Sequence, residues 1–317
     1  MNSRAAAICR QMIADAELLR IAVHQATAGP TVIDCGIDAR GGLEAGRRLA
    51  DVCMAGLGDV SLVPAPHDLS LGLAVVVRSD WPVLACMAAE YAGWKVQQGD
   101  YFAMASGPMR AAAGKESLLE TLGIHERPTS AVGVLETRRL PPPDVLKTLA
   151  EACGVAPDHL TILVAPTASQ AGTVQIVARS LETALHKLFE LGFDLHRIES
   201  GYGIAPLPPV AADDLTAIGR TNDAILYGGE VTLWVRGADA DLEAIGPKIP
   251  SSASPDFGAP FGEIFTRYNK DFYAIDPHLF SPAVVTLANL DTGRSFRFGR
   301  TMSDVIRKSF GTELHDI

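Results

Sequence analysis

PTASQAGTVQIVARSLETALHKLFELGFDLHRIESGYGIAPLPP, residues 166–209, holds one helix framed by two loops rich in helix breakers. Thr167 or Ser169 can cap the helix that follows, and Gly192 stands where glycine commonly ends a helix. The spacing predicts a helix from about Gly172 to Leu191, with a broad apolar stripe typical of a helix packed on a sheet.

Four polar side chains lie beside that stripe, within an arc of about 60° on the helical wheel. They are Gln175, Arg179, Glu182 and His186. Arg179 and Glu182 are one turn apart, so they can form an ordinary surface ion pair worth a few tenths of a kcal/mol. The Arg-before-Glu order is the weaker one for helix stabilisation. A polar strip that faces a ligand is therefore the second interpretation.

Helices and strands alternate along the whole chain, which predicts an α/β (α+β-like) fold. Strands are expected at Tyr101–Ser106, Ser130–Thr137 and Leu160–Ala165, and a helix is expected to start at the Pro141-Pro142-Pro143 run and to end at Cys153. The length favours two domains.

Two Pro-rich breaks, near Val63–Pro66 and Ala205–Val210, suggest where the domains divide. They predict a discontinuous outer domain of about residues 1–80 plus 205–317, and a middle domain of about residues 81–204 that carries the helix described above. A single contiguous cut is the alternative. Residues 200–209, with alternating Gly and Pro, are interpreted as a rigid loop that forms a domain joint or a pocket wall.

Two hairpins are expected in the C-terminal half. Residues 219–237 contain a polar turn, an apolar run, a Gly-Gly pair and a second apolar run; Asn222 and Asp223 there either cap a turn or contact a ligand. Residues 283–299 alternate apolar and polar side chains about Asp291-Thr292-Gly293, which is the clearer hairpin pattern.

Composition excludes some partners. A chain of 317 residues with a net charge of −10 lacks the basic footprint that nucleic acids and anionic membranes require. Its longest apolar runs are too short to cross a bilayer. The five cysteines form no CxxC pair, so we expect reduced thiols in a cytoplasmic protein.

Motifs for metal and nucleotide chemistry are missing from the sequence. It has no HExxH or Gly-x-Ser-x-Gly pattern, and the glycines near Lys115 do not have P-loop spacing. No metal site is predicted, and acid–base chemistry by carboxylates is the most economical enzymatic interpretation. At the strand-to-helix turn after Ser106, Arg110 can hold an anion; a simple tight turn is the alternative.

Eight motifs follow one another along nearly the whole chain: GGLEAG (41–46), SGPMRA (106–111), PTASQAGTVQI (166–176), RSLETALHKLFELGFD (179–194), SGYGIAPLPPV (200–210), GRTNDAILYGG (219–229), IPSSASPDFGAPFGEIF (249–265) and DFYAIDPHLFSPA (271–283). In these motifs and in their order the chain resembles the methenyltetrahydromethanopterin cyclohydrolase family.

The resemblance implies a cytoplasmic enzyme of one-carbon metabolism that reversibly hydrolyses N5,N10-methenyl- to N5-formyl-tetrahydromethanopterin. It implies a homotrimer without a tightly bound cofactor, two α/β domains with the pterin pocket between them, and a source in methanogenesis or in methylotrophic formaldehyde oxidation. The catalytic pair of the family, an Arg and a Glu one helical turn apart, maps onto Arg179 and Glu182.

The substrate implied by this resemblance is anionic, so local basic groups are needed to bind it to an acidic protein. Arg110, Lys115 and Arg220 are the candidates, together with Asn222 and Asp223. Two other functions stay open: a folate-type methenyl cyclohydrolase, and a pterin-binding protein without catalysis.

Overall fold

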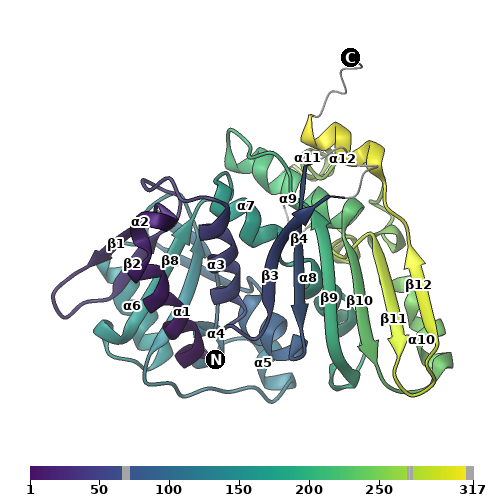
Figure 1. Cartoon of the computed structure of the whole chain (residues 1–317), viewed down its shortest axis with the longest axis horizontal. Helices are drawn as coiled ribbons and strands as arrows, with labels where there is room; N and C mark the ends of the chain where they lie inside the picture. Colours follow the sequence, from purple (N-terminus) through teal and green to yellow (C-terminus); the bar gives the residue numbers. More distant parts are fainter. Residues whose placement is uncertain (66–71, 270, 272–273, 312–317) are drawn as a thin grey trace. The chain divides into compact units, whose positions relative to one another are not determined.

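The computed structural model describes residues 1–65, 72–269, 271 and 274–311. Within these residues the chain forms two mixed β-sheets and many helices, which confirms the predicted mixture of α and β structure (Figure 1). The chain divides into two compact units, Met1–Val60 with Val83–Ile176 and Ser61–Pro82 with Val177–Ile317.

The first unit is built on a six-stranded sheet with the order β1-β2-β8-β7-β6-β5. The pairs β2–β8 and β8–β7 are parallel and the others are antiparallel. Leu163 of β8 belongs to one apolar cluster, and Ile162 and Val164 belong to another. Because neighbouring side chains of a strand point to opposite faces, both faces of this sheet are buried. The strands are β1 (Ala22–Gln25), β2 (Thr31–Asp34), β5 (Trp94–Gln98), β6 (Tyr101–Ser106), β7 (Ala131–Glu136) and β8 (Leu160–Ala165).

Helices cover those two faces. The cluster that contains Leu163 includes side chains of α1 and α3, and the other includes side chains of α4 and α6. The helical segments of this part are α1 (Asn2–Ala14), α2 (Ala16–Leu19), α3 (Leu43–Cys53), a π-helix (Val83–Glu90), α4 (Met109–Ala113), α5 (Ser117–Thr121), α6 (Pro143–Cys153) and α7 (Gln170–Val177).

The second unit is built on a six-stranded sheet with the order β12-β11-β10-β9-β4-β3, whose strands lie side by side in Figure 1. The pair β10–β11 is parallel, whereas β9 is antiparallel to both of its neighbours. The strands are β3 (Asp59–Pro64), β4 (Leu73–Ser79), β9 (Ile198–Pro206), β10 (Glu230–Val235), β11 (Val284–Asn289) and β12 (Ser295–Gly299).

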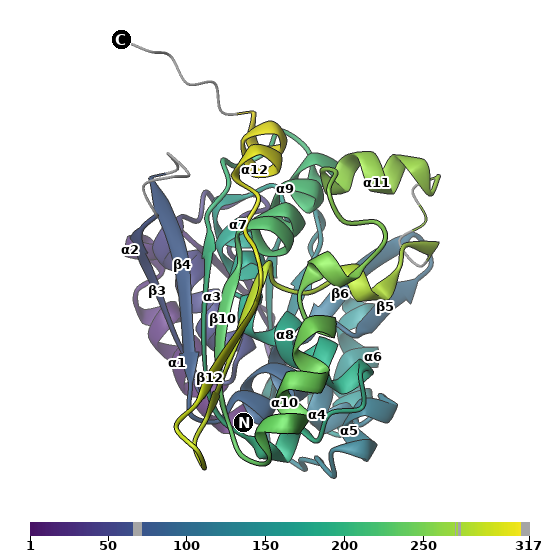
Figure 2. The ribbon, with the colours of Figure 1, turned by 90° about the vertical axis from the view of Figure 1, so that its right-hand side faces the viewer.

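Helix α8 packs on β4, β9 and β10. Helix α9 packs on β9, and α11 and α12 pack against α9, as Figure 2 shows at the top of the view. The side chain of Asp213 caps α9 by accepting a hydrogen bond from the Thr216 nitrogen at 2.9 Å. The helices are α8 (Ser180–Glu190), α9 (Asp214–Gly228), α10 (Asp239–Ile245), α11 (Phe261–Arg267) and α12 (Ser303–Phe310).

Two expectations for this half were wrong. Most of the Gly/Pro-rich segment 200–209 belongs to strand β9, hydrogen-bonded on both sides, and not to a loop. The first arm of the hairpin expected at 219–237 is the C-terminal half of α9, and only the second arm is a strand, β10. Burial of one face of a capped helix outweighs the turn signal of the polar residues at 220–223.

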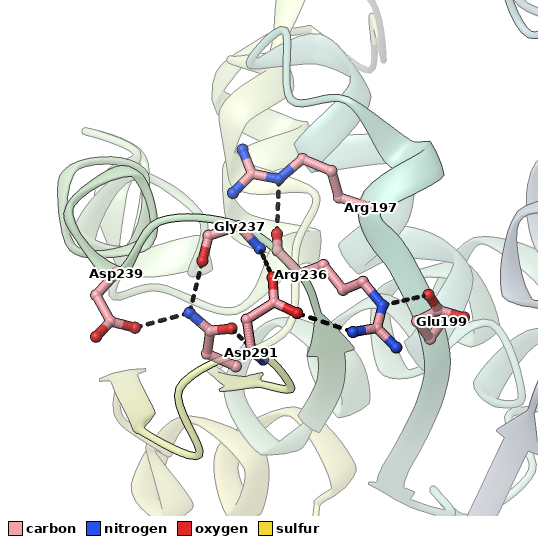
Figure 3. Close-up of polar contacts among 7 residues, drawn as sticks. Arg197, Glu199, Arg236, Gly237, Asp239 and Asp291 are labelled. Atoms are coloured by element: carbon pink, nitrogen blue, oxygen red, sulfur yellow. Dashed lines mark hydrogen bonds and ion pairs between the residues drawn. The ribbon is translucent and has the colours of Figure 1, made fainter.

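The hairpin about Asp291-Thr292-Gly293 is confirmed as β11 and β12. Its turn is tied to the end of β10, as Figure 3 shows: Asp291 accepts hydrogen bonds from the Gly237 nitrogen and from Arg236 Nη1, both at 2.8 Å. The Gly237 N–H and the Arg236 guanidinium lower the pKa of Asp291. Non-local contacts thus add to the local turn signal.

The limits of the two units differ from those expected from the Pro-rich breaks. Residues 1–60 join residues 83–176, because β2 pairs with β8. Residues 177–204 join the C-terminal half, because β9 pairs with β10. Strand pairing between distant segments decides this division; Pro66 of the first break lies outside the described residues.

Two further findings concern membrane-spanning helices and the cysteines. In the described part of the chain, no helix is both long and apolar enough to span a membrane. The five cysteines form no disulfide bond, and all of them are buried. Burial raises the pKa of the Cys9 and Cys153 thiols to about 12, which keeps these thiols protonated and unreactive.

Candidate functional site

The segment that carries the predicted catalytic pair forms two helices and not the single helix expected from Gly172 to Leu191. Helix α7 ends at Val177 and α8 begins at Ser180, with a turn between them. As expected, Ser169 caps the first helix, since its Oγ accepts a hydrogen bond from the Gly172 nitrogen at 3.0 Å. The break between the two helices coincides with the border between the two units. The apolar periodicity of the sequence continues across this border, so it does not reveal the break.

Arg179 and Glu182 lie at the start of α8. Arg179 is the N-cap residue and its carbonyl accepts the hydrogen bond of Thr183 N at 2.9 Å, while Glu182 lies in the first turn. Both residues are nearly buried, with 8% and 5% of their surface exposed. The positive end of the helix dipole favours an ionised carboxylate there, and desolvation opposes it. A carboxylate in such a place can exchange protons with a reacting molecule.

The other two members of the expected polar strip lie on different helices. Gln175 belongs to α7, and its Nε2 donates a hydrogen bond to Cys53 Sγ at 3.5 Å in the buried interior. His186 belongs to α8, and its Nε2 lies 3.8 Å from Glu190 Oε1 on the next turn. A single helical wheel therefore does not apply to Gln175, which the break separates from the other three residues, whereas Glu182 and His186 stay one turn apart on α8.

Arg110 lies in the interior of the first unit. Its Nε and Nη2 donate to the two carboxylate oxygens of Glu116 at 2.7 and 2.5 Å, and its Nη1 donates to the Met87 carbonyl at 3.0 Å. The guanidinium also stacks 5.0 Å from the centre of the Tyr91 ring. Binding an anion here requires breaking a buried bidentate ion pair.

Lys115 stands at the surface close to that ion pair. Its ammonium lies over the Trp94 ring, 4.8 Å from the ring centre, and the side chain is exposed. A cation on an exposed aromatic face is only weakly held. Lys115 is thus more accessible to a ligand than Arg110.

Arg220, Asn222 and Asp223 lie within two turns of α9 and not in a turn between strands. Arg220 donates to two backbone carbonyls, those of Ser309 at 3.3 Å and Pro209 at 3.2 Å. Asn222 donates to the carbonyl of its own helix four residues back, at 2.8 Å. The three side chains make structural contacts around α9.

Asp223 is completely buried and joins α9 to two other helices. Its Oδ1 accepts from the Phe261 nitrogen at 2.8 Å, at the start of α11, and its Oδ2 accepts from Ser309 Oγ at 2.6 Å, in α12. Burial raises its pKa to about 7, although both hydrogen bonds act in the opposite direction. Asp223 caps α11 from a neighbouring helix.

Sequence reasoning did not single out Lys187, on the same helix as the predicted catalytic pair. Only 2% of Lys187 is exposed, and its Nζ donates to the His278 carbonyl at 2.6 Å. Burial lowers its pKa to about 8, and the Asp276 carboxylate opposes that shift. Lys187 lies three residues after Ala184 and therefore on the same buried face of the helix, and this spacing could have indicated a buried lysine.

Within the residues placed by the structure, no group of three or more His, Cys, Asp or Glu side chains is arranged to hold a metal ion. The candidate site is formed by the residues at the start of α8 and the elements that support them.

Comparisons with known proteins agree over nearly the whole chain. A family model described as Cyclohydrolase (MCH) matches residues 1–310. A methenyltetrahydromethanopterin cyclohydrolase of Rhodopirellula baltica is 49% identical over 98% of this chain and 94% of its own length. Proteins of the same name from Xanthobacter autotrophicus and Methanosarcina barkeri are 48% and 41% identical, over 96% and 98% of this chain and 91% and 98% of their own lengths. The chain belongs to the cyclohydrolase (MCH) family.

Proposed function

We propose that this protein interconverts N5,N10-methenyl-tetrahydromethanopterin and N5-formyl-tetrahydromethanopterin by reversible hydrolysis. Membership of the cyclohydrolase family supports the reaction, and the names of the relatives support the substrate. The structural observation that carries the proposal is the position of Arg179 and Glu182, nearly buried at the start of one helix.

The chemistry needs a base and an acid. The methenyl carbon bridges two nitrogens in an amidinium cation and is already electrophilic. Glu182 takes one proton from the water as its oxygen bonds to that carbon. The carbon–N10 bond then breaks, and Glu182 returns the proton to N10. The remaining hydroxyl proton goes to solvent, which leaves the neutral formyl group.

Arg179 holds and orients the carboxylate in this mechanism. A guanidinium offers a planar fork of donors and favours the ionised form of a nearby carboxylate. A free glutamate has a pKa of about 4.3, so it is almost fully ionised near neutral pH and has no proton of its own to donate. The site must raise the proton affinity of Glu182 during the step in which N10 is protonated.

The remaining features are proposals that follow from the resemblance. They are a homotrimer in the cytoplasm, a substrate pocket between two domains, and no tightly bound cofactor or metal. For the anionic part of the substrate, Lys115 and Arg220 are the better candidates, because the cation of Arg110 is occupied by Glu116. Asn222 and Asp223 are weaker candidates, since both are engaged within the helices around α9.

The test compares turnover of the two methenyl pterins, the tetrahydromethanopterin and the tetrahydrofolate derivative, by loss of methenyl absorbance. We expect hydrolysis of the first to be faster by orders of magnitude. Preference for the folate substrate would identify a folate-type cyclohydrolase. Tight binding of both pterins without hydrolysis would identify a binding protein.

A further inference from the structure

Strand β9 carries two glycines in the interior of a sheet, Gly201 and Gly203. The strand is hydrogen-bonded on both sides, and Gly203 pairs with Val231 of β10 and with Val77 of β4. Glycine weakens a strand interior and often marks a close approach of another segment. The two-residue spacing places both glycines on one face of the sheet.

The first turn of α8 lies on that face. A Cβ on residue 203 would stand 2.6 Å from Ser180 Oγ and 3.2 Å from the Leu181 backbone nitrogen. Real Cβ atoms essentially never approach another heavy atom closer than 3.0 Å. The forbidden contact is with the Ser180 hydroxyl, and the contact with the Leu181 backbone nitrogen is already tight. Glycine at position 203 therefore lets the first turn of α8 lie this close to the strand.

Gly201 makes a different contact. A Cβ there would stand 2.5 Å from Cδ1 of Leu181, and its three nearest atoms all belong to that leucine side chain. A leucine side chain can rotate, whereas the backbone nitrogen near Gly203 moves only with the helix. An added methyl group at 203 displaces the Ser180 hydroxyl and presses on the backbone of the first turn of α8, whereas one at 201 meets only the Leu181 side chain.

Ser180 fills the space above Gly203. Its side chain is fully buried, and among the residues that the structure places its hydroxyl has no hydrogen-bond partner. An unpaired buried hydroxyl is unfavourable, so polar bonding does not explain this residue. The small Ser180 side chain instead occupies the space that a Cβ at position 203 would fill.

We infer that Gly203 is a positioning residue for the proposed reaction: it sets how closely the start of α8 approaches β9, and so where Arg179 and Glu182 stand. Ser180 and Leu181 are the two residues between that pair, so any displacement of this turn moves both catalytic side chains. The inference rests on the proposed function. A misplacement of about 1 Å can cost roughly a hundredfold in rate.

Gly203→Ala tests the inference. We expect kcat to fall roughly a hundredfold with a much smaller change in KM, because the first turn moves while the fold remains. Removing the nearest atom should restore the fit. We therefore expect Gly203→Ala/Ser180→Ala to regain at least about tenfold in kcat over Gly203→Ala, with Ser180→Ala alone as its reference.

Two glycine variants serve as comparisons. Gly201→Ala should lose clearly less kcat than Gly203→Ala, because Leu181 can rotate. Gly262→Ala in α11 controls for the exchange itself, since a Cβ there meets no atom within 4 Å, and it should keep wild-type kcat. If Gly203→Ala does not fold, Ser180→Cys places a larger atom in the same contact and should lower kcat with little change in KM.

Three outcomes would overturn the positioning role: wild-type kcat in Gly203→Ala, equal losses in Gly201→Ala and Gly203→Ala, or no recovery in the double variant. An inactive wild-type protein would instead refute the proposed function, and the positioning role with it. In that case the Tm of the same variants would still show whether the contact between Gly203 and Ser180 exists.

Discussion

Glu182 combines two features that a catalytic carboxylate needs, near burial and a place in the first turn of a helix. A carboxylate placed in this way can exchange a proton directly with a reacting molecule. Arg179 precedes it by one turn, as the sequence predicts, although the helix around the pair differs from the expected one.

Glu182→Gln removes the base but keeps the shape of the side chain. We expect substrate binding to persist and turnover to fall by about 10²-fold or more, because the amide cannot accept the proton of water. The measurement is the persistence of the methenyl absorbance after mixing. Glu190→Gln, on an exposed turn of the same helix, is the matched control; near-normal turnover of Glu182→Gln would contradict the mechanism.

Arg179→Lys keeps the positive charge and removes the guanidinium fork. We expect kcat to fall roughly 10–100-fold with little change in KM, because a point charge cannot orient the carboxylate in the same way. Steady-state kinetics measure this, and Arg297→Lys, in an exposed ion pair with Glu230, is the control. An unchanged kcat would mean that charge alone suffices.

At the scale of elements, α9, α11 and α12 are joined through one buried carboxylate, Asp223. Its folded-state pKa of about 7 lies well above that of an exposed aspartate. Between about pH 4 and pH 7 the folded protein therefore holds a proton that the unfolded chain has lost. The contribution of this group to the free energy of unfolding is fully present below about pH 4 and is lost as the pH rises to about 7. The loss is about 1.4 kcal/mol for each unit by which the folded-state pKa exceeds the unfolded-state pKa.

Asp223→Asn should remove that pH dependence. The amide oxygen can still accept from Phe261 N, and the amide N–H groups can donate to Ser309 Oγ, so we expect little change at pH 5 and a higher Tm than wild type at pH 8. Thermal unfolding at both values measures the difference. Asp304→Asn, whose side chain is 91% exposed, is the control. Equal shifts of Tm at both pH values would refute the raised pKa.

At the scale of the whole molecule, each unit has its own six-stranded sheet. Interactions inside one unit should therefore stabilise that unit first. The buried Arg110–Glu116 ion pair is a suitable probe, because both residues belong to the first unit.

Arg110→Met should destabilise the first unit by about 3–5 kcal/mol, because it leaves the Glu116 carboxylate without its partner. Hydrogen exchange followed by mass spectrometry should show faster exchange in β6 and β7 than in β9 and β10. The control is Lys147→Met, in an exposed pair with Glu151, for which we expect a change below about 1 kcal/mol. Equal acceleration in both sheets would show that the units unfold together.

Local patterns by themselves determined much of this protein. Strands β6 and β8 and helix α6 occur where periodicity and Pro or Gly punctuation predict them, and the hairpin about Asp291-Thr292-Gly293 does too. These elements depend on residues close in sequence. The family, and the Arg–Glu pair that its motifs mark, were also evident without coordinates, because they rest on the order of residues.

Only the tertiary structure decided the break between α7 and α8, the strand that contains Gly201 and Gly203, the helix in place of a hairpin at 219–228, and the grouping of segments into two units. Each depends on contacts between residues far apart in sequence. The sequence alone does not distinguish a glycine that allows a helix to pack closely on a strand from a glycine in a loop. Arg110 likewise resembles an anion-binding residue until its buried partner, Glu116, is known.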